Sequence, residues 1–214
     1  MGLNKQSGNM YAFVTHTWNP IRGKCPHDCN YCYMKVYPQP ELYFAEKEMS
    51  TDLGEGNFIF VGSSTDMWAK IVPIPWITNT LIHCSLYANR YLFQSKDPER
   101  FGDFVLPHNS LLGTTIETNR EYGMTKAPPV WERYDTMTRI YQPRMVSIEP
   151  IMDFDLGIMV EWIGRIEPEF VSIGADSKGH KLLEPSPSKI RMLIEELEAL
   201  TIVKIKDNLK RLLV

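Results

Sequence analysis

Short apolar segments alternate with segments of helical character along most of the chain, and each apolar segment ends in polar or glycine residues. Six apolar segments have the length and the β-branched or aromatic content of buried strands, and they cover residues 11–15, 58–62, 90–94, 111–116, 144–149 and 170–174. Six other segments are predicted helices, and they cover residues 31–37, 74–88, 98–104, 128–141, 155–166 and 187–200. The pattern therefore predicts a strand followed by a helix, six times in succession.

This alternation is typical of α/β folds, in which parallel strands are joined by crossover connections. A further apolar run at residues 201–205 indicates one more strand, and a basic segment at residues 206–213 indicates a final helix. A chain of 214 residues can bury one core, and no repeat, low-complexity tract or linker rich in Gly and Ser divides it. We therefore expect a single domain over residues 1–214.

Polar residues gather at the points where the predicted strands end. In a parallel sheet these ends share one edge, and ligands bind beyond it. Ser, Thr, Asp and Asn also cap helices that follow strands, so each residue alone fits capping as well as ligand contact. Their convergence favours a site. They are Ser63, Ser64, Thr65 and Asp66 after the second strand, Lys96 after the third, Glu117 and Asn119 after the fourth, Glu149 at the end of the fifth, and Asp176 after the sixth.

The composition is that of an ordinary folded protein, with 43% hydrophobic and 23% charged residues. A net charge of −3 argues against a broad electrostatic hold on nucleic acid, although it allows a local basic patch. No apolar run approaches the roughly 20 residues that span a bilayer, and the first ten residues lack the features of a secretory signal. We expect a cytoplasmic protein with no membrane partner.

Three of the four cysteines, Cys25, Cys29 and Cys32, lie in the loop between the first predicted strand and the first predicted helix. This clustering suits a metal centre better than a set of disulfides. A [4Fe–4S] cluster normally takes four cysteines, so a loop with three thiolates would leave one iron open to another ligand. Cys84 stands alone, and we expect it to be a small buried apolar side chain.

The motif C-x-x-x-C-x-x-C, with Tyr31 just before its last cysteine, resembles the signature of the radical S-adenosylmethionine (SAM) superfamily. In that superfamily the loop follows the first strand of a partial (β/α)6 barrel, which agrees with the predicted order of elements. The resemblance implies that a [4Fe–4S] cluster on these cysteines binds SAM through its open iron. It also implies an electron donor such as flavodoxin or ferredoxin, whose electron drives SAM cleavage to a 5′-deoxyadenosyl radical that abstracts hydrogen from a substrate.

The resemblance also implies which residues contact SAM. The loop after the second strand would reach the SAM amino group, and the fourth strand would reach the ribose hydroxyls. The fifth strand end would line the site, and the backbone of the sixth would lie near adenine. The residues of the loop after the second strand are Ser63, Ser64, Thr65 and Asp66, and those of the fourth strand are Glu117 and Thr115. Those of the fifth strand end are Glu149 or the nearby Ser147, and those of the sixth strand are Ile173 and Gly174. Lys96 and Asp176 would contact either the SAM carboxylate or the substrate.

Further short blocks resemble a phage- and prophage-associated group of radical-SAM-like proteins whose substrate is unassigned. They cover residues 17–20, 30–33, 60–63, 95–100, 112–117, 147–150 and 172–176. The phage association favours a nucleotide or a nucleic-acid base as substrate. Basic residues near the C-terminus would meet its phosphates or form a solvated helix face, and they are Lys204, Lys206, Lys210 and Arg211. Peptide modification is the second substrate class, weakened because no further cysteine group follows Cys84.

Other interpretations of these residues stay open. The cysteines could form a structural zinc site, completed by His27 or Cys84, in an α/β protein that acts as a binding module. A redox dithiol at Cys29 and Cys32 would leave Cys25 unexplained. Aromatic residues around the loop could stack on a planar substrate, but the area that such side chains bury favours packing of the cysteine-bearing helix. They are Tyr31, Tyr33, Tyr37, Tyr43 and Phe44.

Overall fold

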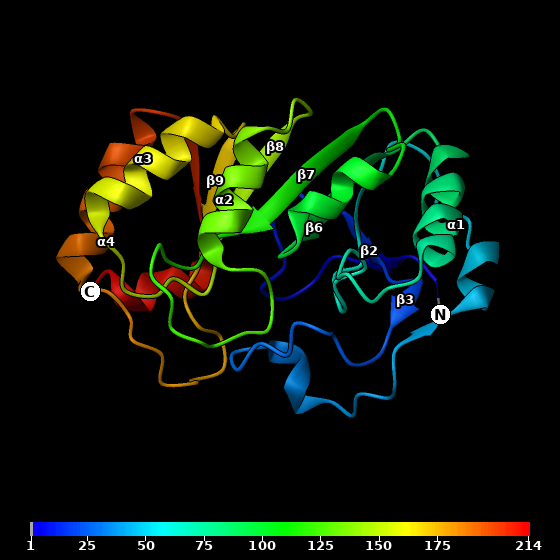
Figure 1. Ribbon diagram of the computed structural model, residues 1–214, viewed down its shortest axis with the longest axis horizontal. Coiled ribbons are helices and arrows are strands. Elements are labelled where there is room, and N and C mark those ends of the chain that lie inside the picture. The colour runs from blue at the N-terminus through cyan, green and yellow to red at the C-terminus, as the bar shows by residue number, and fades with distance from the viewer. Residues whose placement is uncertain (1) are drawn as a thin grey trace.

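A mostly parallel, curved sheet forms the centre of the structure, a computed structural model that describes residues 2–214 (Figure 1). Within those residues the sheet has eight strands in the order β1-β2-β5-β6-β7-β8-β9-β10. The strand β1 is antiparallel to β2, and all the other neighbours are parallel. The strands are β1 (Asn4–Lys5), β2 (His16–Trp18), β5 (Phe58–Val61), β6 (Arg90–Ser95), β7 (Ser110–Thr115), β8 (Arg144–Ile148), β9 (Phe170–Ile173) and β10 (Ile202–Ile205). A short antiparallel pair, β3 (Ile21–Arg22) and β4 (Tyr43–Phe44), lies apart from the sheet.

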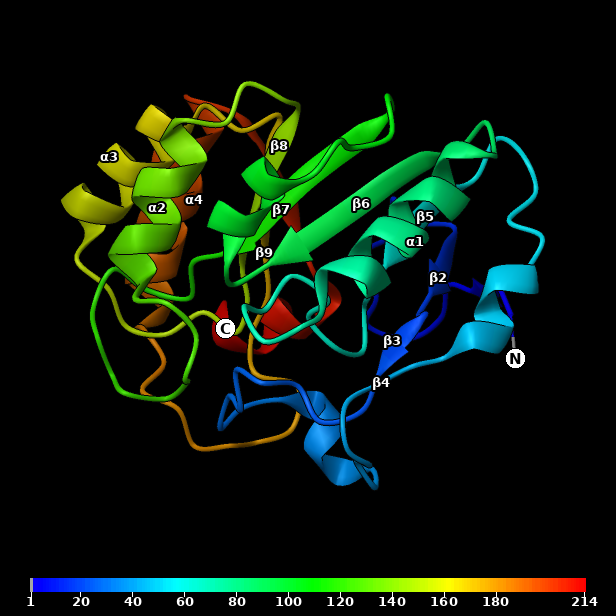
Figure 2. The ribbon, with the colours of Figure 1, turned by 45° about the vertical axis from the view of Figure 1, so that its right-hand side comes forward.

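This sheet confirms the predicted α/β class and the partial barrel of parallel strands. From β2 to β10, each strand of the sheet lies beside the one that follows it in sequence. Within the described residues β1 and β10 each pair with one neighbour, so the barrel is open between them. The helix α1 (Ile74–Ser85) covers the outside of one half, and α2 (Val130–Thr138), α3 (Leu156–Ile166) and α4 (Pro187–Glu198) gather outside the other half (Figure 2).

The four α-helices bury narrow apolar stripes against the sheet. Buried positions three or four residues apart share one face of a helix, as Ile190, Leu193 and Leu197 do in α4. The start of α4 is fixed by Ser186, whose hydroxyl accepts a hydrogen bond from the Lys189 N–H, and by Pro187 in the first turn. The four helices were predicted from this periodicity, and three of them end two or three residues earlier than expected.

Three other predicted helices are short 3₁₀ segments. Residues 31–37 contain η1 (Tyr33–Val36), residues 98–104 contain η3 (Pro98–Asp103), and residues 206–213 contain η4 (Asp207–Leu212). A fourth segment, η2 (Glu46–Ser50), was not predicted. The prolines at positions 38 and 40 follow η1 closely, and proline cannot continue a helix because it lacks the backbone N–H.

The first strand was predicted too early in the chain. Residues 11–15 are not a strand, and β2 begins at His16. The alternation of Tyr11 and Phe13 comes from a different arrangement, in which both rings pack inside the barrel. Phe13 lies 4.8 Å from Phe170 between ring centroids, and the Tyr11 hydroxyl bonds Ser147 at 2.8 Å. We call residues 9–14 the N-terminal plug.

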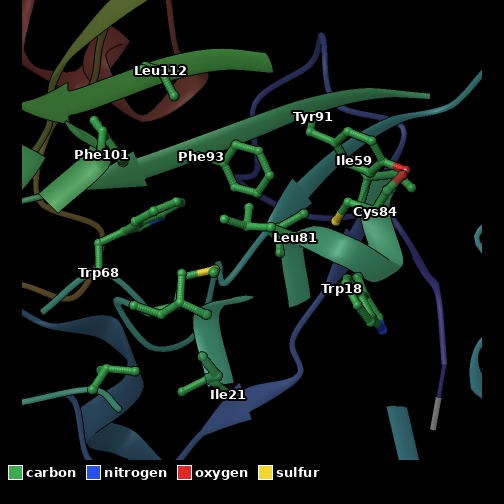
Figure 3. Packing of buried hydrophobic residues seen from close by; sticks show 14 of the residues in the cluster. Trp18, Ile21, Ile59, Trp68, Leu81, Cys84, Tyr91, Phe93, Phe101 and Leu112 are labelled. Atoms are coloured by element: carbon green, nitrogen blue, oxygen red, sulfur yellow. The ribbon is translucent and has the colours of Figure 1, made fainter. Parts of the chain in front are cut away.

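The outer face of the sheet holds two large apolar cores. One of them, shown in Figure 3, joins β5, β6 and α1 around the fully buried Trp18 and Trp68, with Phe93 packed edge-on against Trp68 at 5.5 Å between ring centroids. Cys84 belongs to this core, as predicted, and is completely buried. The other core joins β8 and β9 to α2, α3 and α4. These cores fix the strands whose ends carry the candidate site.

The loops that follow the strands meet on one side of the molecule. The cysteine loop, the loop after β7 and the loop after β9 lie together below the sheet in Figures 1 and 2. This is the edge at which the sequence predicts a ligand site. None of the helices formed by residues 2–214 combines the length and the apolar character needed to cross a bilayer.

Candidate functional site

The cysteine loop, residues 25–32, turns back on itself, and Cys29 is close enough to Cys25 and to Cys32 to act on both thiols electrostatically. Backbone hydrogen bonds join Asp28 N to Cys25 O at 3.2 Å and Cys32 N to Cys29 O at 3.1 Å. Asp28 has a φ of 45°, a left-handed conformation that tightens the turn. Burial raises the pKa of the Cys25 thiol to about 12, and electrostatic repulsion from Asp66 and, less strongly, from Cys29 adds to this shift. Burial and the same neighbour raise the pKa of Cys32.

The loop after β5 holds the chain that leads into the cysteines. The hydroxyls of Ser63 and Ser64 both donate to the Asn19 side-chain oxygen, at 3.2 and 3.0 Å. The Thr65 hydroxyl donates to the Gly23 carbonyl at 2.9 Å. Gly23 has a φ of 101°, and a Cβ there would lie 2.3 Å from the Glu41 carbonyl oxygen. Only glycine fits this position, so the approach to the cysteines is sterically fixed.

Asp66, from the same loop, bonds the cysteine loop directly. Its carboxylate lies 2.9 Å from His27 Nε2 and accepts hydrogen bonds from the Ser95 hydroxyl and the Lys96 backbone N–H. Burial alone would raise the pKa of Asp66, but His27 and the donated hydrogen bonds hold it below its usual value. Asp66 therefore ties the ends of β5 and β6 to the cysteine loop.

A second segment, residues 122–127, crosses the other side of the cysteine loop, and we call it the strap. Its backbone pairs with the loop through Asn30 N to Met124 O at 2.8 Å and Lys126 N to His27 O at 2.7 Å. The Thr125 hydroxyl lies 3.2 Å from the Cys29 sulfur. The cysteine loop is thus held between the loop after β5 and the strap.

A buried ion cluster lies under the loop. The Glu117 carboxylate accepts hydrogen bonds from Lys96 and from the Tyr31 hydroxyl, and it pairs with Arg133 at 2.9 Å. Burial alone would raise the pKa of Glu117, but the charges of Lys96 and Arg133 lower it to about 2. The sequence prediction missed Arg133, which shares the buried stripe of α2 with Val130. A cation at such a position is itself a signal of a buried carboxylate partner.

Glu149 anchors a second polar group on the far side of the barrel. Its carboxylate accepts hydrogen bonds from Lys206 at 2.7 Å and from Asn9 and Asn208 at 3.1 Å each. A Cβ at Gly174 would lie 2.7 Å from a Glu149 oxygen, so the glycine makes room for this carboxylate. The group joins the N-terminal plug to the chain after β10, and no sequence pattern linked these segments.

The remaining predicted residues divide between these two groups. Thr115 accepts a hydrogen bond from Gln94 at 3.1 Å, and Gln94 and Ser147 both bond the Tyr11 hydroxyl. Asp176 pairs with His180 at 2.7 Å beside a cavity of about 330 Å³. Ile173 is completely buried in the outer core, with Gly174 directly after it. The structure therefore joins Asp66, Lys96 and Glu117 to the cysteine loop and joins Ser63, Ser64 and Thr65 to the chain that leads into it. It puts Glu149, Gly174 and Asp176 in the neighbouring group.

The aromatic residues around the loop do not share one environment. Tyr31 is buried under the loop, and Phe44 stacks on Trp76 at 5.9 Å between ring centroids, as the packing prediction requires. Tyr33, Tyr37 and Tyr43 are 43%, 58% and 40% exposed, and Tyr33 also donates a hydrogen bond to the Ser63 carbonyl at 2.8 Å. These three rings follow the cysteine motif and are accessible for contact with another molecule.

The donor set of the loop fits an iron–sulfur cluster better than a single zinc ion. Residues 2–214 contain no group of three His, Cys, Asp or Glu side chains arranged around one metal ion. A structural zinc ion needs all its ligands within about 2.3 Å of one point, whereas a [4Fe–4S] cluster takes one thiolate per iron and spreads them. Cys84 lies in the outer core, so it is not available as a fourth zinc ligand, and His27 is held by its Nε2 hydrogen bond to Asp66.

No family model and no curated protein matches the chain, but solved structures share its fold. A spore photoproduct lyase mutant with dinucleoside spore photoproduct has a TM-score of 0.67 at 9% identity, over 94% of this chain and 78% of that one. Another mutant of that lyase, with bound AdoMet and dinucleoside spore photoproduct, has a TM-score of 0.60 at 10% identity, over 91% and 64%. SuiB of Streptococcus suis bound to S-adenosylmethionine has a TM-score of 0.59 at 10% identity, over 88% and 49%. At these identities the similarity establishes the fold alone.

Proposed function

We propose that this chain is a radical SAM enzyme, formed as one domain over residues 1–214, in which Cys25, Cys29 and Cys32 hold a [4Fe–4S] cluster. The observation that carries the proposal is the position of the cysteine motif. It lies at the edge of a parallel sheet where the ends of β5, β6 and β7 converge, on a fold shared with structures that bind SAM. An electron donor such as flavodoxin or ferredoxin belongs to the same proposal, as does the likeness to a phage-associated group, which rests on short sequence blocks alone.

When bound, the reduced cluster and SAM supply a 5′-deoxyadenosyl radical that takes a hydrogen atom from the substrate. The residues of this chain bind and orient the reactants. Ser63 and Ser64 each donate to Asn19, and their oxygens keep lone pairs that can accept from the SAM ammonium group. The ammonium group of Lys96 lies 5.2 Å from the centre of the Tyr31 ring, and it suits the SAM carboxylate.

Glu117 and Thr115 are proposed to meet the ribose hydroxyls. The Glu117 oxygen that pairs with Arg133 accepts that one hydrogen bond, and a carboxylate oxygen has room for a second donor. Thr65 and Asp66 support this side by fixing the cysteine loop. Glu149, Gly174, the Ile173 backbone and Asp176 are proposed for the adenine and substrate side, next to the cavity of about 330 Å³.

A nucleotide or nucleic-acid base is the proposed substrate class. The basic residues near the C-terminus give it little support, because Lys206 and Arg211 pair with Glu149 and Glu184, and Lys204 lies over the Phe13 and Phe170 rings. The exposed Tyr33, Tyr37 and Tyr43 support it better, since nucleobases stack on aromatic rings. The dinucleoside bound to the lyase neighbours is consistent with the same class.

Anaerobic reconstitution with iron and sulfide tests the enzyme class. We expect an electron paramagnetic resonance (EPR) signal from the reduced protein that changes when SAM is added, together with release of 5′-deoxyadenosine. Cys29→Ala should abolish both results, whereas Cys84→Ala, which changes a cysteine of the outer core, should leave them intact. Binding of one zinc ion per chain and no iron would contradict the proposal and favour a structural metal site.

Binding of short single-stranded oligonucleotides tests the substrate class. We expect Tyr37→Ala to weaken binding by about 1–3 kcal/mol per stacked base, because the ring is exposed and its loss disturbs little packing. Tyr141→Ala is the matched control, since that ring is 98% exposed and lies away from the cysteine motif in sequence. Equal loss in both variants, or no binding at low salt by the unchanged protein, would exclude nucleic acid as the substrate.

A further inference from the structure

The hydroxyl of Thr125 has an unusual place beside the cysteine loop. Within residues 2–214 it is the side-chain group that hydrogen-bonds a sulfur of the motif, 3.2 Å from Cys29. The sulfurs of Cys25 and Cys32 instead receive backbone hydrogen bonds, from Asp66 and His27 and from Met34. A side-chain donor differs from these in one respect, because its single hydrogen can change acceptor by rotation.

The hydrogen bonds around Thr125 are complete only while Cys29 is a protonated thiol. The hydroxyl donates its hydrogen to the His27 carbonyl at 3.0 Å and accepts from Ala127 N–H at 3.1 Å. The contact with Cys29 must then use the hydrogen of the thiol. A metal-bound thiolate has no hydrogen and can only accept, so the same 3.2 Å contact then needs the hydrogen of Thr125.

The change of acceptor costs little elsewhere in the strap. The His27 carbonyl also accepts from Lys126 N–H at 2.7 Å, so it keeps a hydrogen bond when the hydroxyl turns away. The strap itself is held to the loop by Asn30 N to Met124 O at 2.8 Å, and Thr125 therefore stays in place while its hydroxyl rotates. The exchange replaces a neutral hydrogen bond with a charge-assisted one.

We propose that Thr125 is a positioning residue for Cys29, whose hydroxyl donates to the metal-bound sulfur and thereby raises the reduction potential of the cluster. The inference rests on the proposed function, because it requires the cluster. One electron enters from the low-potential donor, and no covalent bond at Thr125 forms or breaks. The added negative charge is shared by the cysteine sulfurs, so a hydrogen bond to one of them stabilises the reduced state more than the oxidised state.

The test is a potentiometric titration of the reconstituted protein, followed by EPR of the reduced cluster. Thr125→Val removes the hydroxyl and keeps the shape, and Thr125→Ser keeps the hydroxyl. Thr201→Val is the matched control, because Thr201 also donates to a backbone carbonyl, that of Pro168 at 2.7 Å, at the opposite end of the sheet before β10. We expect Thr125→Val to favour the oxidised cluster by up to about tenfold at a fixed potential, which is about 59 mV for one electron. Thr125→Ser and Thr201→Val should match the unchanged protein.

The outcomes separate the inference from the proposed function. If the unchanged protein takes up no cluster, both fail. If every variant carries the cluster and Thr125→Val has the midpoint potential of the unchanged protein, the inference fails and the proposed function stands. A Thr125→Val protein that loses the cluster, beside a Thr125→Ser protein that keeps it at the original potential, also overturns the inference, because Thr125 would then hold the loop together without setting the potential.

Discussion

The two faces of the curved sheet carry different side chains, although adjacent residues of the same strands supply both. Outward positions such as Ile59 and Phe93 are fully buried and apolar, and they enter the cores under the helices. Inward positions change along a strand, and in β6 the apolar Leu92 precedes a polar position. Near the strand ends they become polar, as Gln94 and Ser147 do.

The difference shows which face of the sheet stabilises the fold and which face carries polar groups that can bind a ligand. Burial of apolar area on the outer face stabilises the fold, whereas a polar group in the interior costs free energy unless it is hydrogen-bonded. On the inner face the groups are bonded to one another and to the cysteine loop, through Glu117 and Asp66. Polar groups that are hydrogen-bonded to one another beside three thiols are typical of a ligand-binding site. They bury little apolar area and so contribute little to the stability of the fold.

Truncation of adjacent residues on one strand gives the sharpest contrast between the faces. Phe93→Ala should lower the free energy of unfolding by about 4 kcal/mol, because it opens a cavity against Trp68 and Tyr91. Gln94→Ala, one residue further along β6, should cost only about 1 kcal/mol, since it removes hydrogen bonds from a partly buried group. Chemical denaturation measures both. Equal losses would mean that the inner face contributes as much packing as the outer one.

The ion cluster on the inner face should be the exception to that contrast. Arg133→Met should lower the free energy of unfolding by about 3 kcal/mol, because it removes one of the two cations that compensate the buried Glu117. Arg139→Met on the same helix is the control, since its pair with Asp135 is exposed and should be worth less than about 1 kcal/mol. A loss no larger than the control's would show that Lys96 alone compensates Glu117.

Periodicity was enough to predict most of the fold. Five strands from β5 to β9 begin and end within one residue of the predicted bounds, because outward apolar positions and the glycine or polar residues that follow them mark each strand. The two-residue strands β1, β3 and β4 were not predicted, and β2 was predicted too early, because Tyr11 and Phe13 alternate like a strand but fill the barrel interior. Residues 11–14 form a hydrogen-bonded turn, and a local pattern cannot distinguish a strand from a turn whose side chains pack inside a sheet.

The candidate site was predicted in its parts but not in its connections. The cysteines were predicted from their spacing, and the strand-end residues were predicted from the order of strands and helices along the chain. The strap, the N-terminal plug and Arg133 act through contacts between residues distant in sequence, such as Thr125 with Cys29 and Asn9 with Glu149. Such contacts depend on how the loops fold over the sheet edge, and no local pattern carries that information.

Low pH should weaken the ion pairs of the inner face, whereas the apolar packing of the outer face does not depend on pH. The folded-state pKa of Glu117 is about 2, below its ordinary value of 4.5, so its contribution to stability is complete above about pH 4.5 and is lost as the pH falls toward 2. Protonation of Glu117 alone should lower the free energy of unfolding by about 2 kcal/mol between pH 5 and pH 3. Glu117→Gln should flatten that part of the profile, measured by denaturation at each pH, whereas Phe93→Ala should keep the slope. An unchanged slope in Glu117→Gln would assign the acid sensitivity to other carboxylates.

The N-terminal plug offers the smallest and most specific test of the inner face. The Tyr11 hydroxyl is hydrogen-bonded to Gln94 at 2.9 Å and to Ser147 at 2.8 Å. Tyr11 and Ser147 are both buried inside the barrel, so bulk water does not compete for their hydrogen bond. Tyr11→Phe keeps the ring packing and should cost about 1 kcal/mol, whereas Tyr141→Phe, at a 98% exposed ring, should cost nothing measurable. In a double-mutant cycle with Ser147→Ala the two losses should not add, because each substitution removes the same hydrogen bond. Additive losses would mean that the Tyr11 hydroxyl stabilises the barrel independently of Ser147, through its hydrogen bond to Gln94.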